Sequence, residues 1–265
     1  MTVPGVSGGT MAMVVGIYEQ LLHAINNLRK HPKEYLLFLI QFILGAGIGF
    51  VLFARVVSML LENPVLGVPT RFLFCGVVAG GIPFIWKKAQ AVDKTSGNQV
   101  SRISNIGIIV RGFWIIVGII IVRFLSLIPQ GTFAGGIEGS SYWLQFVGGI
   151  VVAVALVLPG ISVTHMLYIL GIYEVVMKQV YSLEWIDLLP LVVGTVAGIL
   201  LTTHLLEWLM QRCTREVYLV ILGFVVGSLW ELVPKHAIHS PVLCMVIAIG
   251  GFVIMYALIQ KGVND

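Results

Sequence analysis

Charged residues are scarce in this chain. Only 11% of its 265 residues are Asp, Glu, Lys or Arg, whereas 58% are hydrophobic, and the mean hydropathy is +1.00. So few polar side chains cannot cover the surface of a water-soluble domain, and several apolar runs are long enough to cross a bilayer. The composition therefore predicts an integral membrane protein.

Cysteines and clustered basic residues are also few. Cys75, Cys213 and Cys244 are far apart and form no C-x-x-C pair, which argues against a disulfide framework or a metal centre. The net charge of +4 is not concentrated into a basic patch that would bind nucleic acid. The first residues also lack the pattern of a cleavable signal peptide. We therefore expect no metal, no cofactor and no nucleic-acid partner.

A Pro-Gly-x-Ser motif occurs twice in the sequence. The first copy is "VPGVSGGT" at residues 3–10, and the second is "LPGISVTH" at residues 158–165. An alignment without gaps over sixteen positions gives eight identities, including a shared Gly-Ile-Tyr-Glu ending at 16–19 and 171–174. Such self-similarity at a fixed offset favours an internal repeat.

The likeness continues along both halves of the chain. "GAGIG" at 45–49 aligns with "GTVAG" at 194–198, and "CGVVAG" at 75–80 aligns with "LGFVVG" at 222–227. We therefore predict an all-α polytopic membrane protein with two inverted repeats. Each repeat is expected to hold a re-entrant helix, broken at Pro-Gly, and three transmembrane helices.

The repeats divide the chain at an uncharged-to-acidic, glycine-rich loop. Unit 1 is expected over 1–128, with a motif helix over 3–19 and spans over about 35–61, 70–86 and 104–128. Unit 2 is expected over 141–265, with a re-entrant arm over 141–158, a motif helix over 159–175 and spans over about 186–210, 217–233 and 241–260. Unit 1 has no counterpart of the 141–158 arm, so we expect the natural protein to begin upstream of Met1.

Basic residues orient the two units in the membrane. The loops before the first span and after the second contain Arg29, Lys30, Lys33, Lys87, Lys88, Lys94 and Arg102. Loops rich in Lys and Arg face the cytoplasm, which places the 129–140 loop, with Glu138 and no basic residue, outside. If the arm and the second motif form a hairpin that enters and returns, the two units have opposite orientations. That is the inverted repeat of alternating-access transporters.

The Pro-Gly breaks predict an anion site inside the membrane. Proline suits the first turn of a new helix, and glycine allows close approach to the backbone. Free N–H groups at a helix start, with hydroxyls beside them, attract an anion and above all a phosphate. Two such starts in an inverted pair meet near the bilayer midplane. The candidate residues are Gly5, Ser7, Gly8, Gly9 and Thr10 in the first motif, and Gly160, Ser162, Thr164 and His165 in the second.

Ionisable residues in or beside the apolar helices are the second group of candidates, because burying a charge in lipid is costly unless it has a partner or a substrate. We expect Arg55, Arg111 and Arg123 to help bind the anion. Glu19 and Glu174 close their motif helices and recur at one repeat position, so anchors in the headgroup zone, an ion pair with an arginine and a coupled proton all stay open. Two alternatives stay open: His165 is a satisfied structural donor, and the Pro-Gly kinks merely let helices pack closely.

The two motifs together resemble a bacterial membrane family long described only as a domain of unknown function, the PopT-type undecaprenyl phosphate translocases. "VPGVSGGTMAMVVGIYE" and "LPGISVTHMLYILGIYE" carry the resemblance, which spans nearly the whole chain. It implies a multi-pass inner-membrane flippase, not an enzyme, that returns undecaprenyl phosphate to the cytoplasmic leaflet for cell-envelope synthesis. Family members usually have residues before the first motif that this chain lacks.

Three other functions remain open on the sequence. A transporter of a small soluble anion would use the same architecture. An intramembrane lipid phosphatase would need a nucleophile with a base, or a metal cluster, and His204 and Glu207 alone do not form an H-E-x-x-H motif. A purely structural partner would make no use of charges inside the membrane. The oligomeric state is not determined by the sequence.

Overall fold

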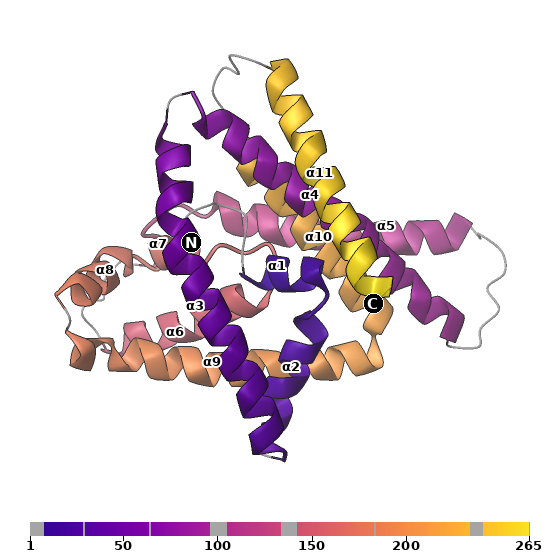
Figure 1. The fold of residues 1–265 in the computed structure, drawn as a ribbon. Coiled ribbons are helices and arrows are strands. Elements are labelled where there is room, and N and C mark those ends of the chain that lie inside the picture. The colour runs from indigo at the N-terminus through magenta and orange to yellow at the C-terminus, as the bar shows by residue number, and fades with distance from the viewer. Residues whose placement is uncertain are drawn as a thin grey trace.

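Every regular element that the structure describes is an α-helix (Figure 1). The computed structural model describes residues 8–28, 30–63, 65–95, 105–133, 142–182, 184–233 and 241–264. In chain order the helices are α1 (Gly8–Val15), α2 (Tyr18–Asn27), α3 (Pro32–Glu62), α4 (Gly67–Thr95), α5 (Asn105–Leu127), α6 (Tyr142–Val157), α7 (Val163–Ile169), α8 (Tyr173–Tyr181), α9 (Trp185–Arg212), α10 (Thr214–Leu232) and α11 (Pro241–Asn264). The prediction of an all-α protein is confirmed for these residues.

Four stretches of helix are long and apolar enough to cross a bilayer, which confirms a multi-pass membrane protein. They are Gly67–Gln90 in α4, Val110–Leu127 in α5, Trp185–Arg212 in α9 and Pro241–Lys261 in α11. The spans expected over 35–61 and 217–233 are also helical, in α3 and α10. α6 is apolar but has only 16 residues, which rise about 24 Å, less than the roughly 30 Å of a hydrocarbon core.

Each motif forms two helices instead of the single helix expected over 3–19 and 159–175. Gly16, with φ of 86°, separates α1 from α2, and Gly171, with φ of 71°, separates α7 from α8. These are left-handed conformations that glycine adopts without strain and that end a helix. The shared Gly-Ile-Tyr-Glu sequence is therefore a helix stop followed by a new helix start.

This break also corrects the expected position of the two repeated glutamates. They were expected to close their motif helices, but Glu19 lies in the first turn of α2 and Glu174 in the first turn of α8. A carboxylate in a first turn is stabilised by the positive end of the helix dipole. The repetition of Glu at this place thus has a local structural reason in addition to any functional one.

Glycines allow helices from the two halves of the chain to pack closely. α4 packs along α11, and α5 packs along α10 (Figure 1). A Cβ atom at Gly76 of α4 would lie 2.0 Å from the carbonyl oxygen of Ala248, and one at Gly118 of α5 would lie 2.3 Å from that of Val220. No side chain fits at these distances, so these glycines serve helix contact.

A glycine contact also joins α6 to α9, whereas α3 has no such contact. A Cβ atom at Gly194 of α9 would lie 2.1 Å from the carbonyl oxygen of Phe146 in α6. Gly45 of α3, which aligns with Gly194, has no atom within 4 Å of its Cβ position. α3 packs on α2 and α4 and leaves many of its large apolar side chains exposed. The expectation of an upstream arm is not tested by the described residues.

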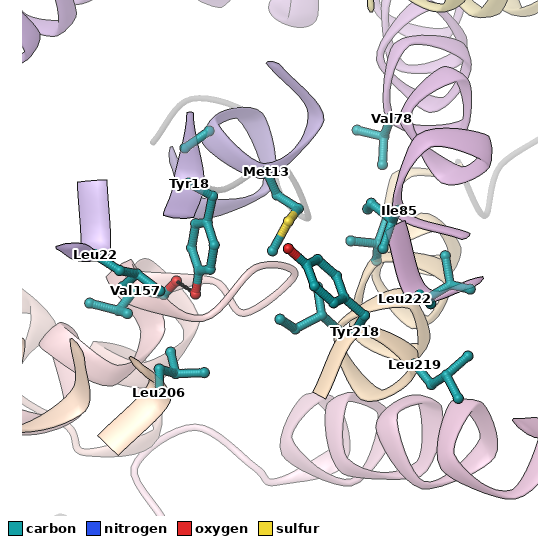
Figure 2. Packing of buried hydrophobic residues seen from close by; sticks show 14 of the residues in the cluster. Met13, Tyr18, Leu22, Val78, Ile85, Val157, Leu206, Tyr218, Leu219 and Leu222 are labelled. Atoms are coloured by element: carbon teal, nitrogen blue, oxygen red, sulfur yellow. Dashed lines mark hydrogen bonds between the residues drawn. The ribbon is translucent and has the colours of Figure 1, made fainter. Parts of the chain in front are cut away.

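A large buried cluster connects the first motif to the helices of both halves (Figure 2). Met13 of α1 and Tyr18 of α2 belong to it, together with Ile85 of α4 and Leu222 of α10. The Tyr18 hydroxyl donates a hydrogen bond of 3.0 Å to the carbonyl oxygen of Val157, at the end of α6. This bond satisfies a buried hydroxyl and fixes the first motif beside the residues that lead into the second Pro-Gly.

Candidate functional site

The two Pro-Gly motifs contact each other directly. The hydroxyl oxygen of Thr10 accepts a hydrogen bond of 2.9 Å from the backbone N–H of Gly160, and this bond is buried. A Cβ atom at Gly9 would lie 2.8 Å from the carbonyl oxygen of Val157, so the backbones approach too closely for any side chain there. We call this contact of Gly9 and Thr10 with residues 157–160 the motif junction.

The motif junction uses groups that the sequence assigned to an anion. Thr10 is fully buried, and its hydroxyl occupies the Gly160 N–H that was expected to bind a phosphate. Gly160 itself has φ of 83° and a Cβ position 2.5 Å from the carbonyl oxygen of Phe224. In this conformation Gly9, Thr10 and Gly160 join the two motifs, and Gly8 is the exposed member of the first motif. Gly5 and Ser7 lie outside the described residues.

Substitution of Thr10 by valine is expected to destabilise the protein by about 1–3 kcal/mol. Valine keeps the shape but removes the acceptor, so a buried N–H loses its hydrogen bond. Thr10→Ser should restore most of the loss. Thr195→Val in α9 is the matched control, because its hydroxyl bonds only a carbonyl that the helix already uses, Leu191 O at 2.8 Å. Thermal unfolding in detergent measures all three; equal stability of the two valine variants would contradict the assignment.

The second motif forms one wall of a small polar cavity. Ser162 caps α7 by accepting a hydrogen bond of 3.4 Å from the backbone N–H of His165. Nε2 of His165 lies 3.1 Å from the carbonyl oxygen of Leu125, so in the neutral ring this nitrogen carries the proton and donates it. The cavity holds about 10 Å³ and is lined by Val122, Leu125, Ser126, Gly160, Ile161, Ser162, His165, Met166 and Glu231.

Glu231 is a site residue that the sequence reasoning missed. It lies in the last turn of α10, and the hydroxyl of Ser126 on α5 donates a hydrogen bond to its carboxylate. The sequence analysis did not single it out, although it falls within the span expected over 217–233. The signal that could have found it is the rule that ionisable residues within spans are functional candidates.

The three candidate arginines lie in different places. Arg123 is half-buried on α5, with its guanidinium carbon 5.6 Å from the ring centre of Trp230, the neighbour of Glu231. Arg111 is eleven residues before Val122, which places it roughly 16 Å along α5 from the small cavity. It interacts with other groups there. Arg55 is exposed on α3. Of the three, Arg123 is the one next in sequence to a residue that lines the small cavity, Val122.

The remaining candidates lie outside this cavity. Glu19 forms an ion pair of 2.9 Å with Lys88 of α4, not with an arginine, and both side chains are partly exposed. Glu174 is exposed on α8, and Thr164 is half-buried on α7 but does not line the cavity. Among the described residues no group of three His, Cys, Asp or Glu side chains could hold a metal ion.

A much larger cavity, of about 600 Å³, lies between α2, α3, α9 and α10. Its lining includes the carboxylates of Glu19, Glu34 and Glu207 and, among the described residues, no Lys or Arg. Negative charges repel a phosphate, so its size does not make it the better phosphate site. The smaller cavity has the hydroxyls of Ser126 and Ser162 and the imidazole of His165 beside a single carboxylate, Glu231, and it adjoins the second motif.

Comparisons with known proteins agree with the resemblance carried by the two motifs. The model of a family described as undecaprenyl phosphate translocase-like matches residues 1–246. A polyprenyl-phosphate transporter of Vibrio cholerae serotype O1 is 28% identical over 250 residues, covering 88% of this chain and 73% of the relative. A polyprenyl-phosphate transporter of Staphylococcus aureus is 27% identical over 270 residues, covering 97% of this chain and 90% of the relative. No solved structure matches.

These matches decide between the classes that the sequence left open. The family is one of translocases and both relatives are named as transporters, so the prediction of a translocase instead of an enzyme is confirmed. The match covers both Pro-Gly motifs and the helices between them. The chain therefore belongs to the undecaprenyl phosphate translocase-like family of membrane transporters.

Proposed function

We propose that this protein moves undecaprenyl phosphate, or a closely similar polyprenyl phosphate, from the outer to the cytoplasmic leaflet of the bacterial inner membrane. The family and the names of the two relatives support the substrate class. The observation that carries the proposal is the motif junction, because it brings two breaks in apolar helices together, 150 residues apart in sequence. Irregular backbone inside a membrane is stable only in contact with protein or a polar cavity.

The chemical task is to replace the water around the phosphate head group. A phosphate monoester carries one to two negative charges and cannot cross hydrocarbon unaided at a useful rate. The start of the first motif, residues 7–10, would receive the head group, with help from Ser162 and an arginine. Arg123 is our choice for that arginine because it follows Val122, which lines the cavity, and packs over Trp230. The polyprenyl tail stays in lipid throughout.

Alternating access would come from the two repeats moving against each other. By the order of the expected spans, α4 of the first repeat corresponds to α10 of the second, and α5 corresponds to α11. A symmetry that relates the two repeats would therefore turn the α4–α11 contact into the α10–α5 contact, and both contacts are present. The α4–α10 contact then lies where a two-fold axis would pass. This pairing supports inverted repeats, and the short α6 supports a re-entrant arm. Parting the motif junction would free the Gly160 N–H and the Thr10 hydroxyl for the phosphate.

Arg123→Gln tests this site. Loss of a charge-assisted hydrogen bond to the phosphate costs about 1.5–3 kcal/mol, so we expect roughly a tenfold to hundredfold weaker polyprenyl phosphate binding. The control is Arg212→Gln, because Arg212 stacks on Trp208 at 4.8 Å in the same way but lies at the far end of α9. Proteoliposomes carrying a fluorescent polyprenyl phosphate and an external quencher measure the transfer. Unchanged transfer by well-folded Arg123→Gln removes this residue from the site.

The same proteoliposomes separate the alternatives. A carrier of lipid phosphates should prefer long prenyl chains over inorganic phosphate, whereas a transporter of a small soluble anion should not. Release of inorganic phosphate from the lipid would instead indicate a phosphatase. Transfer of polyprenyl phosphate with no phosphate release is the expected result.

A further inference from the structure

Glu231 is an acidic residue in a place that is unfavourable for negative charge. It lies in the last turn of α10, at the negative end of the helix dipole, and lines a cavity whose walls include Val122, Ile161 and Met166. Its carboxylate accepts a hydrogen bond from the Ser126 hydroxyl, and the structure shows no salt bridge to it from any residue it describes. A carboxylate that lines a cavity with apolar walls and forms no salt bridge is a candidate for proton binding.

The ionisable neighbours of Glu231 are few. The cavity is walled by α5, by α10 and by the segment from Gly160 into α7. α7 contributes His165, and α5 contributes Arg123 near the cavity, over Trp230. α4 and α9 also pack on α10 but contribute no residue to this cavity. Among the described residues, Glu231 and His165 are therefore the two ionisable groups that line this cavity, and Arg123 stays positive.

We propose that Glu231 binds a proton together with each phosphate head group, so that substrate binding at the second motif is coupled to protonation. This inference rests on the proposed function. A phosphate held by Ser162 and His165 would lie in the cavity that Glu231 lines, and two like charges so close in an apolar site destabilise each other. Glu231 is neutral when the phosphate is bound and ionised when the site is empty.

The geometry also gives the proton a mechanical effect. The Ser126–Glu231 hydrogen bond connects α5 to α10 across the cavity, and the remaining volume of about 10 Å³ is too small for a phosphate. A hydrogen bond to an ionised carboxylate is about twice as strong as one to a neutral group. Protonation of Glu231 therefore removes the repulsion and weakens the bond that holds the cavity closed. Release of the proton closes it again.

Calorimetric titration of the full chain in lipid nanodiscs with farnesyl phosphate tests the proposal. Two buffers of different ionisation enthalpy at each pH give the number of protons taken up per phosphate. We expect the unmodified protein to take up about one more proton than Glu231→Gln where Glu231 is ionised in the empty site. As pH rises, the affinity of the unmodified protein for farnesyl phosphate should fall by up to tenfold per pH unit relative to that of Glu231→Gln. The reason is that ionised Glu231 must take up a proton before the phosphate binds. Protons taken up or released by the phosphate of the ligand itself are the same for both proteins, so they cancel in this comparison.

Two further variants make the assignment specific. Glu216→Gln, at the other end of α10, should keep the proton uptake of the unmodified protein. His165→Gln should bind more weakly but keep the extra proton, because the proton resides on Glu231. Thermal unfolding of each variant verifies that it is folded.

The possible results are distinguishable. Equal proton uptake by the unmodified protein and Glu231→Gln overturns the inference, as does loss of the extra proton in His165→Gln alone. In either case phosphate binding itself leaves the proposed function standing. Absence of farnesyl phosphate binding at every pH overturns the proposed phosphate site, and with it the coupling.

Discussion

Gly160→Val is expected to be among the most damaging single substitutions in this chain. Gly160 has φ of 83°, and a Cβ atom there would lie 2.5 Å from the carbonyl oxygen of Phe224. Left-handed strain of about 1–2 kcal/mol adds to overpacking of about 1–3 kcal/mol, so we expect a loss of roughly 2–5 kcal/mol. Because Gly160 donates to Thr10, the motif junction should be lost and transport with it.

The measurement is thermal unfolding of purified protein, together with the proteoliposome transfer rate. Gly250→Val in α11 is the matched control, because no atom lies within 4 Å of its Cβ position and its backbone is helical. It should stay within about 1 kcal/mol of the unmodified protein, since valine and glycine are both poor helix formers. If Gly160→Val unfolds and transports like Gly250→Val, the left-handed turn between the motifs is not essential.

Gly194→Leu is the second substitution expected to have a large effect. Its Cβ would lie 2.1 Å from the carbonyl oxygen of Phe146, a backbone atom that cannot move without displacing α6. Overpacking of this kind costs about 1–3 kcal/mol or more. α6 leads directly into the second Pro-Gly, so its displacement should also reduce transport.

The repeat supplies the control for this substitution. Gly45 aligns with Gly194 in the sequence, and its Cβ position on α3 has no atom within 4 Å. Gly45→Leu should therefore leave thermal unfolding nearly unchanged, while Gly194→Leu lowers the unfolding temperature by several degrees. If Gly45→Leu destabilises the protein as much as Gly194→Leu, the close approach of α6 to α9 is not the cause of the loss.

Four of the expected spans overlap helices that are long and apolar enough to cross a membrane, because this property is local to each segment. Apolar length and the placement of Lys and Arg can be read without knowing any contact. The sequence analysis missed the break in each motif because Gly16 and Gly171 were read as glycines within a helix. A glycine followed by Ile-Tyr-Glu in both copies was the available signal, since glycine commonly ends helices in the left-handed conformation.

The candidate site was less predictable than the fold. The sequence identified the two motifs and predicted that Thr10 and Gly160 bind an anion, but it gave no sign that they bond each other in this structure. It grouped three arginines that the structure separates, and it overlooked Glu231, whose importance comes from Ser126 on another helix. The Thr10–Gly160 and Ser126–Glu231 contacts join residues more than a hundred positions apart, and the three arginines lie on two different helices.

The sequence by itself predicted a helical membrane protein and showed one Pro-Gly-x-Ser motif in two copies. These properties follow from composition, hydrophobic length and backbone chemistry, all of which are local. Only the tertiary structure shows that the two motifs are joined by the hydrogen bond from Gly160 to Thr10, and that Glu231 and His165 line the same cavity. Those contacts depend on how closely glycine-bearing helices approach one another, and that distance is set by the packing of the whole bundle.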